Sequence, residues 1–228
     1  LGQIVNHYLA PDDSACDFTT LVEEIHGIDG IERIRFASPH PRHFSVRFLE
    51  AMQRLPKIAR HLHLPVQSGS TSILKAMRRR YSRESYLELV DQIRTMLPDV
   101  AISTDMIVGF PGETEADFED TLSLTRAARF NSMFSFKYSP RPNTLADKRM
   151  KDDVPEETKT ARIVELQALQ RTIQEGIHAD MVGTSVDVLI DSASRRRDTE
   201  LSGRTSQNTV VNLPGDPSWI GQIGRAHV

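Results

Sequence analysis

Residues 103–114 read STDMIVGFPGET, and this stretch decides the fold prediction. Three apolar residues stand in a row at 106–108, as in a buried strand, and a tight turn with glycines at 109 and 112 precedes an acidic helix start. Asp105 stands inside the strand, where a carboxylate needs polar partners because desolvating it alone is costly. A structural hydrogen-bonding role and a ligand-binding role both stay open for it. The stretch lacks the glycine pattern of dinucleotide-binding turns and of phosphate-binding loops.

Strands and helices alternate on both sides of this stretch. Apolar spacing and turn residues predict strands at 31–37, 60–66, 100–108 and 132–138, and helices at 19–28, 45–55, 71–79, 83–97 and 115–129. Residues 1–3 read as the end of one more strand. This order predicts parallel strands joined by helical crossovers. Polar strand residues such as His61, His63 and Thr104 favour a barrel over a flat doubly wound sheet, because a lumen accepts polar side chains near its mouth.

The composition changes after residue 142. Residues 147–153 form a charged linker, and Pro155 begins a long helix that reaches about residue 180. The segments 185–190, 200–205 and 209–213 alternate like strands and are separated by turns. The sequence therefore predicts a second, small β-barrel domain after the α/β domain.

The overall composition excludes several classes of protein. The chain has 228 residues and a net charge of −3, so no global positive field indicates nucleic acid, although a local patch is compatible with it. No apolar run is long enough to span a membrane and no signal peptide is visible, so we expect a cytoplasmic protein. Cys16 is the single cysteine and cannot by itself hold zinc or an iron–sulfur cluster.

Every expected strand is followed by a polar or glycine-rich loop. In parallel α/β folds these loops meet at one edge, where ligands bind, although any single loop of this kind is also typical of plain turns. His61 and His63 share a face of one strand, and packing, substrate contact or a metal site are all compatible with that pattern. The basic run at 195–197 is compatible with phosphate contacts or with a solvated loop.

Taken together, the loops resemble one family. The stretches that carry the resemblance are LGQIVN at 1–6, SPHPRHF at 38–44, LHLPVQSGS at 62–70, STDMIVGFPGET at 103–114 and FKYSPRPNT at 136–144. They look like the radical S-adenosylmethionine methylthiotransferases, and the loops at 38–41 and 141–144 look most like the tRNA-modifying branch. GRT at 203–205 and VVNLPG at 210–215 resemble the TRAM domain, a small β-barrel that binds tRNA. Asn143 replaces a usual glycine, and asparagine tolerates the positive φ that this turn needs.

The resemblance implies a reaction, its cofactors and its partners. S-adenosyl-L-methionine would be cleaved at one [4Fe-4S] cluster, and sulfur and a methyl group would be inserted at C2 of N(6)-isopentenyladenosine next to the anticodon, with a second [4Fe-4S] cluster in the full-length protein. The implied partners are the tRNA anticodon stem-loop and an electron donor such as flavodoxin or ferredoxin, with a monomeric enzyme. Threonylcarbamoyladenosine in tRNA, a ribosomal protein, or a non-catalytic RNA-binding role remain alternatives.

The resemblance also assigns site residues by position. The cofactor-binding positions are Gln3, Gln67, Ser68, Gly69, Asp105, Ile107, Gly109 and Glu113. Tyr138 and Arg141, at the last strand end, are assigned to substrate or cofactor contact, and Arg141 suits a carboxylate or phosphate because its guanidinium binds such groups in bidentate fashion. No catalytic residue and no metal ligand is assigned.

The same resemblance predicts domain boundaries and an incomplete enzyme. It predicts a partial radical SAM barrel over 1–145, a linker and helix over 146–181, and an incomplete TRAM-like RNA-binding domain over 182–222. Residues 223–228 (IGRAHV) read like a translated sequencing adapter, so we expect them not to be natural. The CxxxCxxC loop that ligates the radical cluster in the family is not in this chain, and we expect the chain alone to be inactive.

Overall fold

The computed structural model describes residues 4–13, 15–37, 39–195 and 197–228. The α/β part contains α1 (Phe18–His26), α2 (Val46–Arg54), β1 (His61–His63), α3 (Thr71–Ala76), α4 (Arg83–Met96), β2 (Ala101–Val108), α5 (Glu115–Ala128), β3 (Ser132–Lys137), α6 (Leu145–Arg149) and α7 (Glu156–Ala179), with short 3-10 turns at Val5–His7 and Pro41–His43. The C-terminal part contains β4 (Ser185–Ala193), β5 (Glu200–Thr205), β6 (Val210–Pro214), a 3-10 turn at Pro217–Trp219 and β7 (Ile223–His227). The predicted alternation of strands and helices is confirmed from β1 to β3.

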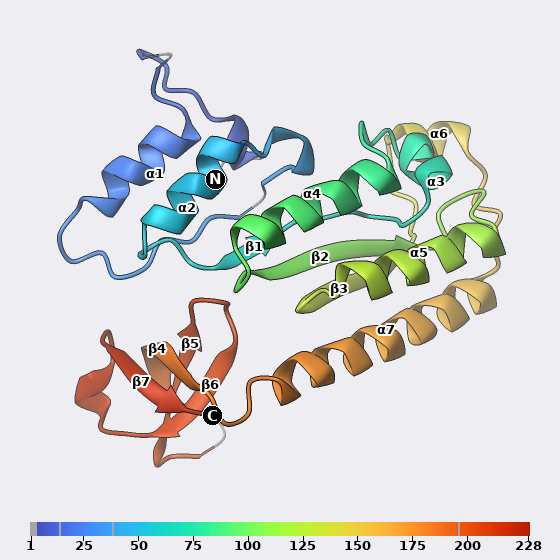
Figure 1. The fold of residues 1–228 in the computed structure, drawn as a ribbon. Coiled ribbons are helices and arrows are strands. Elements are labelled where there is room, and N and C mark those ends of the chain that lie inside the picture. Colours follow the sequence, from blue (N-terminus) through green and yellow to red (C-terminus); the bar gives the residue numbers. More distant parts are fainter. Residues whose placement is uncertain (1–3, 14, 38, 196) are drawn as a thin grey trace.

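The first sheet is parallel, as predicted, with the order β1-β2-β3 (Figure 1). Isolated parallel bridges join Ile34 to Ile58 and Gln67 to Met106. The expected strand at 31–37 is therefore wrong among the described residues, because only the backbone of Ile34 pairs with the neighbouring segment, through Lys57 and Ala59. Helix α6 lies where the sequence predicted only a charged linker.

The two faces of this sheet differ in chemistry. Leu62, Ile102 and Met106 point into the apolar core beneath helices that pack side by side in the order α2, α4, α5, α7 (Figure 1). The alternate residues of the strands point to the opposite face, since successive strand residues alternate in direction. Asp105 belongs to that face, which explains how a carboxylate fits within an apolar strand.

Helix α5 begins at a dense set of hydrogen bonds around Asp117. Thr114 and Asp117 form a capping box, and the Asp117 carboxylate also accepts bonds from the hydroxyls of Ser70 and Ser72 at 2.5 and 2.6 Å. Burial disfavours the charged carboxylate, but these hydrogen bonds outweigh burial and lower the pKa of Asp117 to about 2. Asp117 therefore fastens the starts of α3 and α5 to each other.

Replacing Asp117 by asparagine is expected to cost about 1–2 kcal/mol at pH 7, after allowance for solvent screening. Because the folded pKa lies below the ordinary value of 3.8, the stabilisation is complete well above that value and is lost as the pH falls toward 2. Urea unfolding at pH 7, 5 and 3 should show the difference between wild type and variant falling to roughly half near pH 3. Glu119→Gln, at an exposed position of the same helix, is the control; an equal D117N effect at all three pH values contradicts the prediction.

The C-terminal part is an antiparallel sheet with the order β6-β5-β4-β7. Its last strand, β7, pairs with β4: Ser185 lies opposite His227 at one end of the pairing and Leu189 lies opposite Ile223 at the other. The sheet thus extends beyond the predicted boundary at residue 222. That residues 223–228 are not natural stays a prediction.

The turn between β5 and β6 docks against the α/β part. Arg33 donates to the carbonyl of Arg204 at 2.5 Å, and Arg35 donates to the carbonyl of Thr205 at 3.2 Å. The backbone N–H of Arg60 donates to the hydroxyl of Ser206 at 2.9 Å. These bonds, made at the end of the sheet where β1 begins, join segments more than 140 residues apart in sequence and fix how the two parts meet.

Candidate functional site

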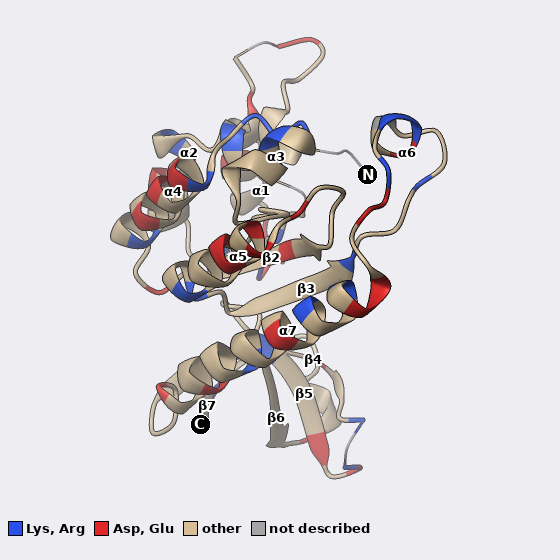
Figure 2. Cartoon of the chain, turned by 90° about the vertical axis from the view of Figure 1, so that its right-hand side faces the viewer, with Lys and Arg blue, Asp and Glu red and all other residues tan. Residues whose placement is uncertain are grey.

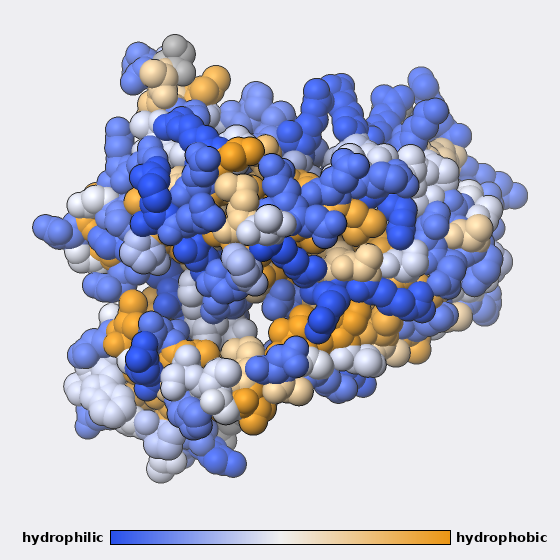
Figure 3. All heavy atoms as spheres, viewed as in Figure 1, coloured by the Kyte–Doolittle hydropathy of each residue, from blue (hydrophilic) through white to orange (hydrophobic). Residues whose placement is uncertain are grey.

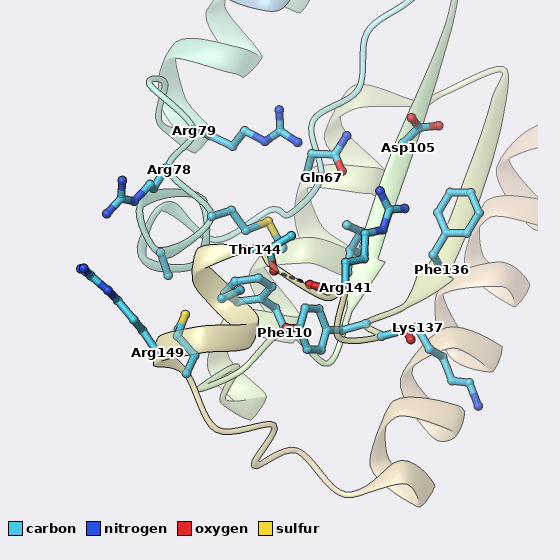
Figure 4. A pocket seen from close by; sticks show the side chains of 17 residues that line it. Gln67, Arg78, Arg79, Asp105, Phe110, Phe136, Lys137, Arg141, Thr144 and Arg149 are labelled. Atoms are coloured by element: carbon cyan, nitrogen blue, oxygen red, sulfur yellow. Dashed lines mark hydrogen bonds between the residues drawn. The ribbon is translucent and has the colours of Figure 1, made fainter.

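A cavity of about 870 Å³ lies where β2 and β3 end (Figure 4). Its walls come from residue 67, from residues 76–79 after α3, from the β2 end and its turn, and from the β3 end through α6. The carboxyl ends of parallel strands are where ligands of such folds bind, so the predicted convergence of strand-end loops is confirmed for these segments.

Five of the predicted site residues line this cavity. They are Gln67, Asp105, Ile107, Tyr138 and Arg141. Gln67 lies beside β2 because its N–H donates to the Asp105 carbonyl and its carbonyl accepts from Ile107, at 3.0 and 2.9 Å. Figure 4 shows Gln67 and Asp105 on the inner wall and Arg141 extending toward them from the end of β3. Gln3 lies outside the described residues.

Ser68 and Gly69 do not line the cavity. The Ser68 hydroxyl is buried and accepts from the Ser70 N–H, and the Gly69 N–H donates to Thr121 on α5 at 3.0 Å. A side chain at Gly69 would place its Cβ 2.4 Å from the Asp120 carbonyl oxygen, so this glycine allows the loop to touch the backbone of α5.

Gly109 and Glu113 do not line the cavity either. Gly109 has φ +72°, and its N–H donates to the Glu113 carboxylate at 2.8 Å. The same carboxylate forms a buried ion pair with Arg162 of α7 at 2.9 Å. Burial raises the pKa of Glu113, although the Gly109 N–H and the Arg162 guanidinium stabilise its charged form. The contacts of these two residues hold the turn after β2 against α7.

The cavity is basic although the chain is acidic overall. Its lining contains five cationic side chains, those of Arg78, Arg79, Lys137, Arg141 and Arg149, and one carboxylate, that of Asp105. Figure 2 shows Lys and Arg gathered on the segments around α3 and α6. The arginines at 78, 79 and 149 were not predicted as site residues, although the run MRRR at 77–80 was an available signal for the first two.

Few of these cations are neutralised by the protein. Lys137 pairs with Glu156, whereas the other four have no carboxylate partner among the ion pairs of the described residues. The Nε of Arg79 is buried and has no hydrogen-bond partner in the described part of the chain. Figure 4 shows the Arg79 side chain reaching toward Gln67. Such an arrangement suits an anionic ligand group, because buried donors are normally satisfied.

Apolar and aromatic groups complete the walls. The rings of Phe110 and Tyr138 meet edge to face with centroids 5.1 Å apart. Burial, followed by the nearby carboxylates of Asp152 and Asp147, raises the pKa of Tyr138, which favours its neutral phenol form. On the edge strand β3, Phe136 lines the cavity and is 52% exposed, and Figure 3 shows apolar surface over the region of β3 and α7. The cavity thus offers apolar walls to a ring as well as charges to an anion.

Comparison with known proteins identifies the two parts of the chain. Residues 10–125 match the Radical SAM superfamily, and residues 179–228 match the TRAM domain. The chain belongs to the radical SAM superfamily. A solved structure of coproporphyrinogen III oxidase from Escherichia coli, titled a radical SAM enzyme, has a similar fold over 59% of this chain and 31% of its own, with a TM-score of 0.50 and 20% identity.

Relatives with higher sequence identity to this radical SAM chain are named tRNA-2-methylthio-N(6)-dimethylallyladenosine synthase. The relative from Nitrosospira multiformis is 45% identical over 100% of this chain and 49% of its own length. The relative from Halorhodospira halophila is 47% identical over 100% of this chain and 48% of its own length. The chain therefore spans about half the length of the curated relatives it matches.

Radical SAM chemistry uses S-adenosylmethionine and an iron–sulfur cluster, and the residues of this chain fit the first group and not the second. S-adenosylmethionine fits the cavity, which offers a carboxylate and an amide near apolar walls and an arginine whose buried Nε has no partner among the described residues. A cluster held by several thiolates does not fit this chain's own residues, since Cys16 is its single cysteine. Within the described residues no group of three or more His, Cys, Asp or Glu side chains is placed to hold a metal ion, so the metal alternative for His61 and His63 gains no support.

No helix in the described part of this radical SAM chain is both long and apolar enough to cross a bilayer. Asn143 has φ +70°, as expected for this turn.

Proposed function

We propose that this chain is the S-adenosylmethionine-binding barrel and TRAM region of a tRNA methylthiotransferase that modifies C2 of N(6)-isopentenyladenosine next to the anticodon. The observation that carries the proposal is the basic cavity at the strand ends, in a chain whose relatives bear that enzyme name over its full length. Bound S-adenosylmethionine would supply the radical chemistry and the methyl group, together with [4Fe-4S] clusters whose thiolates this chain does not contain.

We assign Gln67, Asp105 and Ile107 to the nucleoside part of S-adenosylmethionine. A carboxylate and an amide can accept bonds from ribose hydroxyls or from an adenine amino group, and Ile107 gives the ring an apolar contact. Tyr138 and Arg141, from the β3 end, are assigned to substrate or to the carboxylate of the cofactor. Gln3 keeps its assignment by resemblance alone.

The remaining predicted cofactor residues are assigned an indirect part. Ser68, Gly69, Gly109 and Glu113 shape the two loops that carry the lining residues, through the buried contacts described above. They act on the cofactor through the position of Gln67 and of the turn after β2.

We assign the basic rim, defined as Arg78, Arg79, Arg141 and Arg149, to the phosphates that flank the modified nucleotide. RNA phosphates require such cations, and the rim surrounds the cavity that would receive the base. The TRAM region would hold another part of the same RNA. The proposal also includes an electron donor such as flavodoxin or ferredoxin, a monomeric protein in the cytoplasm, and no activity of this chain on its own.

Replacing both Arg78 and Arg149 by glutamine is expected to weaken binding of an anticodon stem-loop RNA by about ten-fold at low salt, because two phosphate contacts are lost. The dependence of log K on log salt should also become shallower by roughly 1.4, or 0.7 for each contact. Fluorescence anisotropy from 50 to 300 mM salt measures both quantities. Arg171→Gln, an exposed change on α7 away from the cavity, is the matched control, and a double variant that binds like that control refutes the rim.

The proposed reaction is tested by completing the enzyme. The part of the Nitrosospira multiformis relative that this chain does not match is joined to this chain, and the fusion is expressed in a bacterium that lacks its own enzyme. Mass spectrometry of tRNA nucleosides should show 2-methylthio-N(6)-isopentenyladenosine. A methylthio group found instead on threonylcarbamoyladenosine or on a ribosomal protein would establish a sibling activity. RNA binding without any methylthio product would favour the non-catalytic alternative.

A further inference from the structure

Four polar side chains form a line on the face of β1 and β2 that points away from the helices: His61, Ser103, His63 and Asp105. The His61 Nε2 lies 3.0 Å from the Ser103 hydroxyl, and that hydroxyl lies 2.9 Å from the His63 Nδ1. The His63 Nε2 lies 3.4 Å from an oxygen of Asp105. The pairing of His63 with Ser103 in the parallel register brings these alternate residues of the two strands to one face.

The line connects the cavity with the docking site of the C-terminal sheet. Asp105 lines the cavity, whereas His61 at the other end lies in the field of Arg35 and Arg204, which take part in the docking of the β5–β6 turn. Burial, followed by the charges of Arg35, His63 and Arg204, lowers the pKa of His61 to about 4. His61 is therefore neutral near pH 7 and has one donor and one acceptor.

Counting donors and acceptors gives this line a single direction. A His63 Nε2 that carries the hydrogen faces the Asp105 carboxylate favourably, whereas a lone pair there would repel it. In neutral His63 the Nδ1 then accepts, so the Ser103 hydroxyl donates to it and in turn accepts from the Nε2–H of His61. With both imidazole rings neutral, this is the order in which every donor meets an acceptor.

We propose that His63, held by Ser103 and His61, is a positioning residue that orients Asp105 as the hydrogen-bond acceptor for the nucleoside of S-adenosylmethionine. This inference rests on the proposed function. Asp105 lines the cavity with one carboxylate oxygen 3.4 Å from the His63 Nε2, and it is the single carboxylate among the described lining residues. The ring of Phe134 packs edge-on against His63, with centroids 6.1 Å apart, and limits its rotation.

The first test is a double-mutant cycle on the whole chain with S-adenosylhomocysteine as the probe. NMR titration should show that His63→Leu and Asp105→Asn each weaken binding about ten-fold, and that the double variant is no weaker than either alone. His63→Gln, which keeps a donor and an acceptor, should retain affinity to within about two-fold. Ser135→Ala, at a hydroxyl bonded to Gln167 and away from the line, serves as the control.

The second test needs no ligand. Nitrogen-15 spectra of the histidine rings should show His63 with its hydrogen on Nε2 and His61 likewise, and Ser103→Ala should disturb both signals. Independent, multiplying effects in the cycle, unchanged binding by His63→Leu, or the opposite His63 tautomer would each overturn the inference. These results leave the proposed function standing. Failure of the wild-type chain to bind the probe would count against the S-adenosylmethionine site itself.

Discussion

Replacing Glu113 by glutamine is expected to destabilise the protein by about 3 kcal/mol. The side chains of Glu113 and Arg162 are only 1% and 7% exposed, so the change keeps the size of the side chain but leaves a guanidinium buried without its nearest opposite charge. Glutamine can still accept a hydrogen bond from the Gly109 N–H, so the loss of stability measures the effect of removing the charge. Urea unfolding at pH 7 measures it.

Glu115 supplies a matched control for this prediction. It contacts the same arginine at 3.1 Å, but its own side chain is 82% exposed. Exposed ion pairs contribute little, so Glu115→Gln should cost less than about 1 kcal/mol. Equal costs for the two variants would show that burial of the Glu113 pair does not set the energy.

Replacing Gly69 by alanine is expected to cost about 3 kcal/mol, because the new methyl group meets backbone that cannot move aside alone. Its Cβ would lie 2.4 Å from both the Asp120 oxygen and the Thr121 Cα. Helix α5 would have to shift, and the bond from the Gly69 N–H to Thr121 would be strained. Because Gln67 lies two residues earlier, binding of S-adenosylhomocysteine should weaken together with stability. Denaturant unfolding and the NMR titration follow the two effects.

The control for Gly69 is Gly176, within helix α7. Apart from its chain neighbours and the nearby backbone of its own helix, no atom of the described residues lies within 4 Å of the position that a Cβ would take there. Alanine at that position should stabilise the protein by about 0.5–1 kcal/mol, since alanine loses less backbone freedom in a helix than glycine. A Gly69→Ala variant as stable as wild type would mean that the loop and α5 separate easily.

Features encoded by neighbouring residues were predictable from the sequence. Ser82 caps α4, and Thr114 and Asp117 cap α5; such caps can be predicted because they involve residues only three positions apart. Parallel pairing followed from the alternation of strands and helices. Five of the residues predicted to bind cofactor or substrate line one cavity because strand ends of a parallel sheet meet at one edge, and their binding roles stay predictions.

Features that depend on distant partners were not predictable in this way. The position of Glu113 in a turn is typical of a ligand-facing residue. In the structure its carboxylate instead pairs with Arg162, 49 residues later, and does not line the cavity. Arg79 and Arg149 reach one cavity only because α6 follows β3, and the sequence pattern around α6 indicates only a linker. The segment at 31–37 has strand-like spacing, yet among the described residues it forms a single β-bridge, between Ile34 and Ile58.

The pairing of β7 has a practical consequence for handling this protein. Strand β7 covers one side of β4 from Ser185 to Leu189, and Val228 adds bonds to Gly183 and Thr184. Trimming the chain at residue 222 would leave that side of β4 as a bare row of N–H and C=O groups. Such exposed strands recruit other chains and aggregate. Whatever their origin, the last six residues cover this edge of β4, and we expect a chain trimmed at residue 222 to aggregate more readily than the full chain.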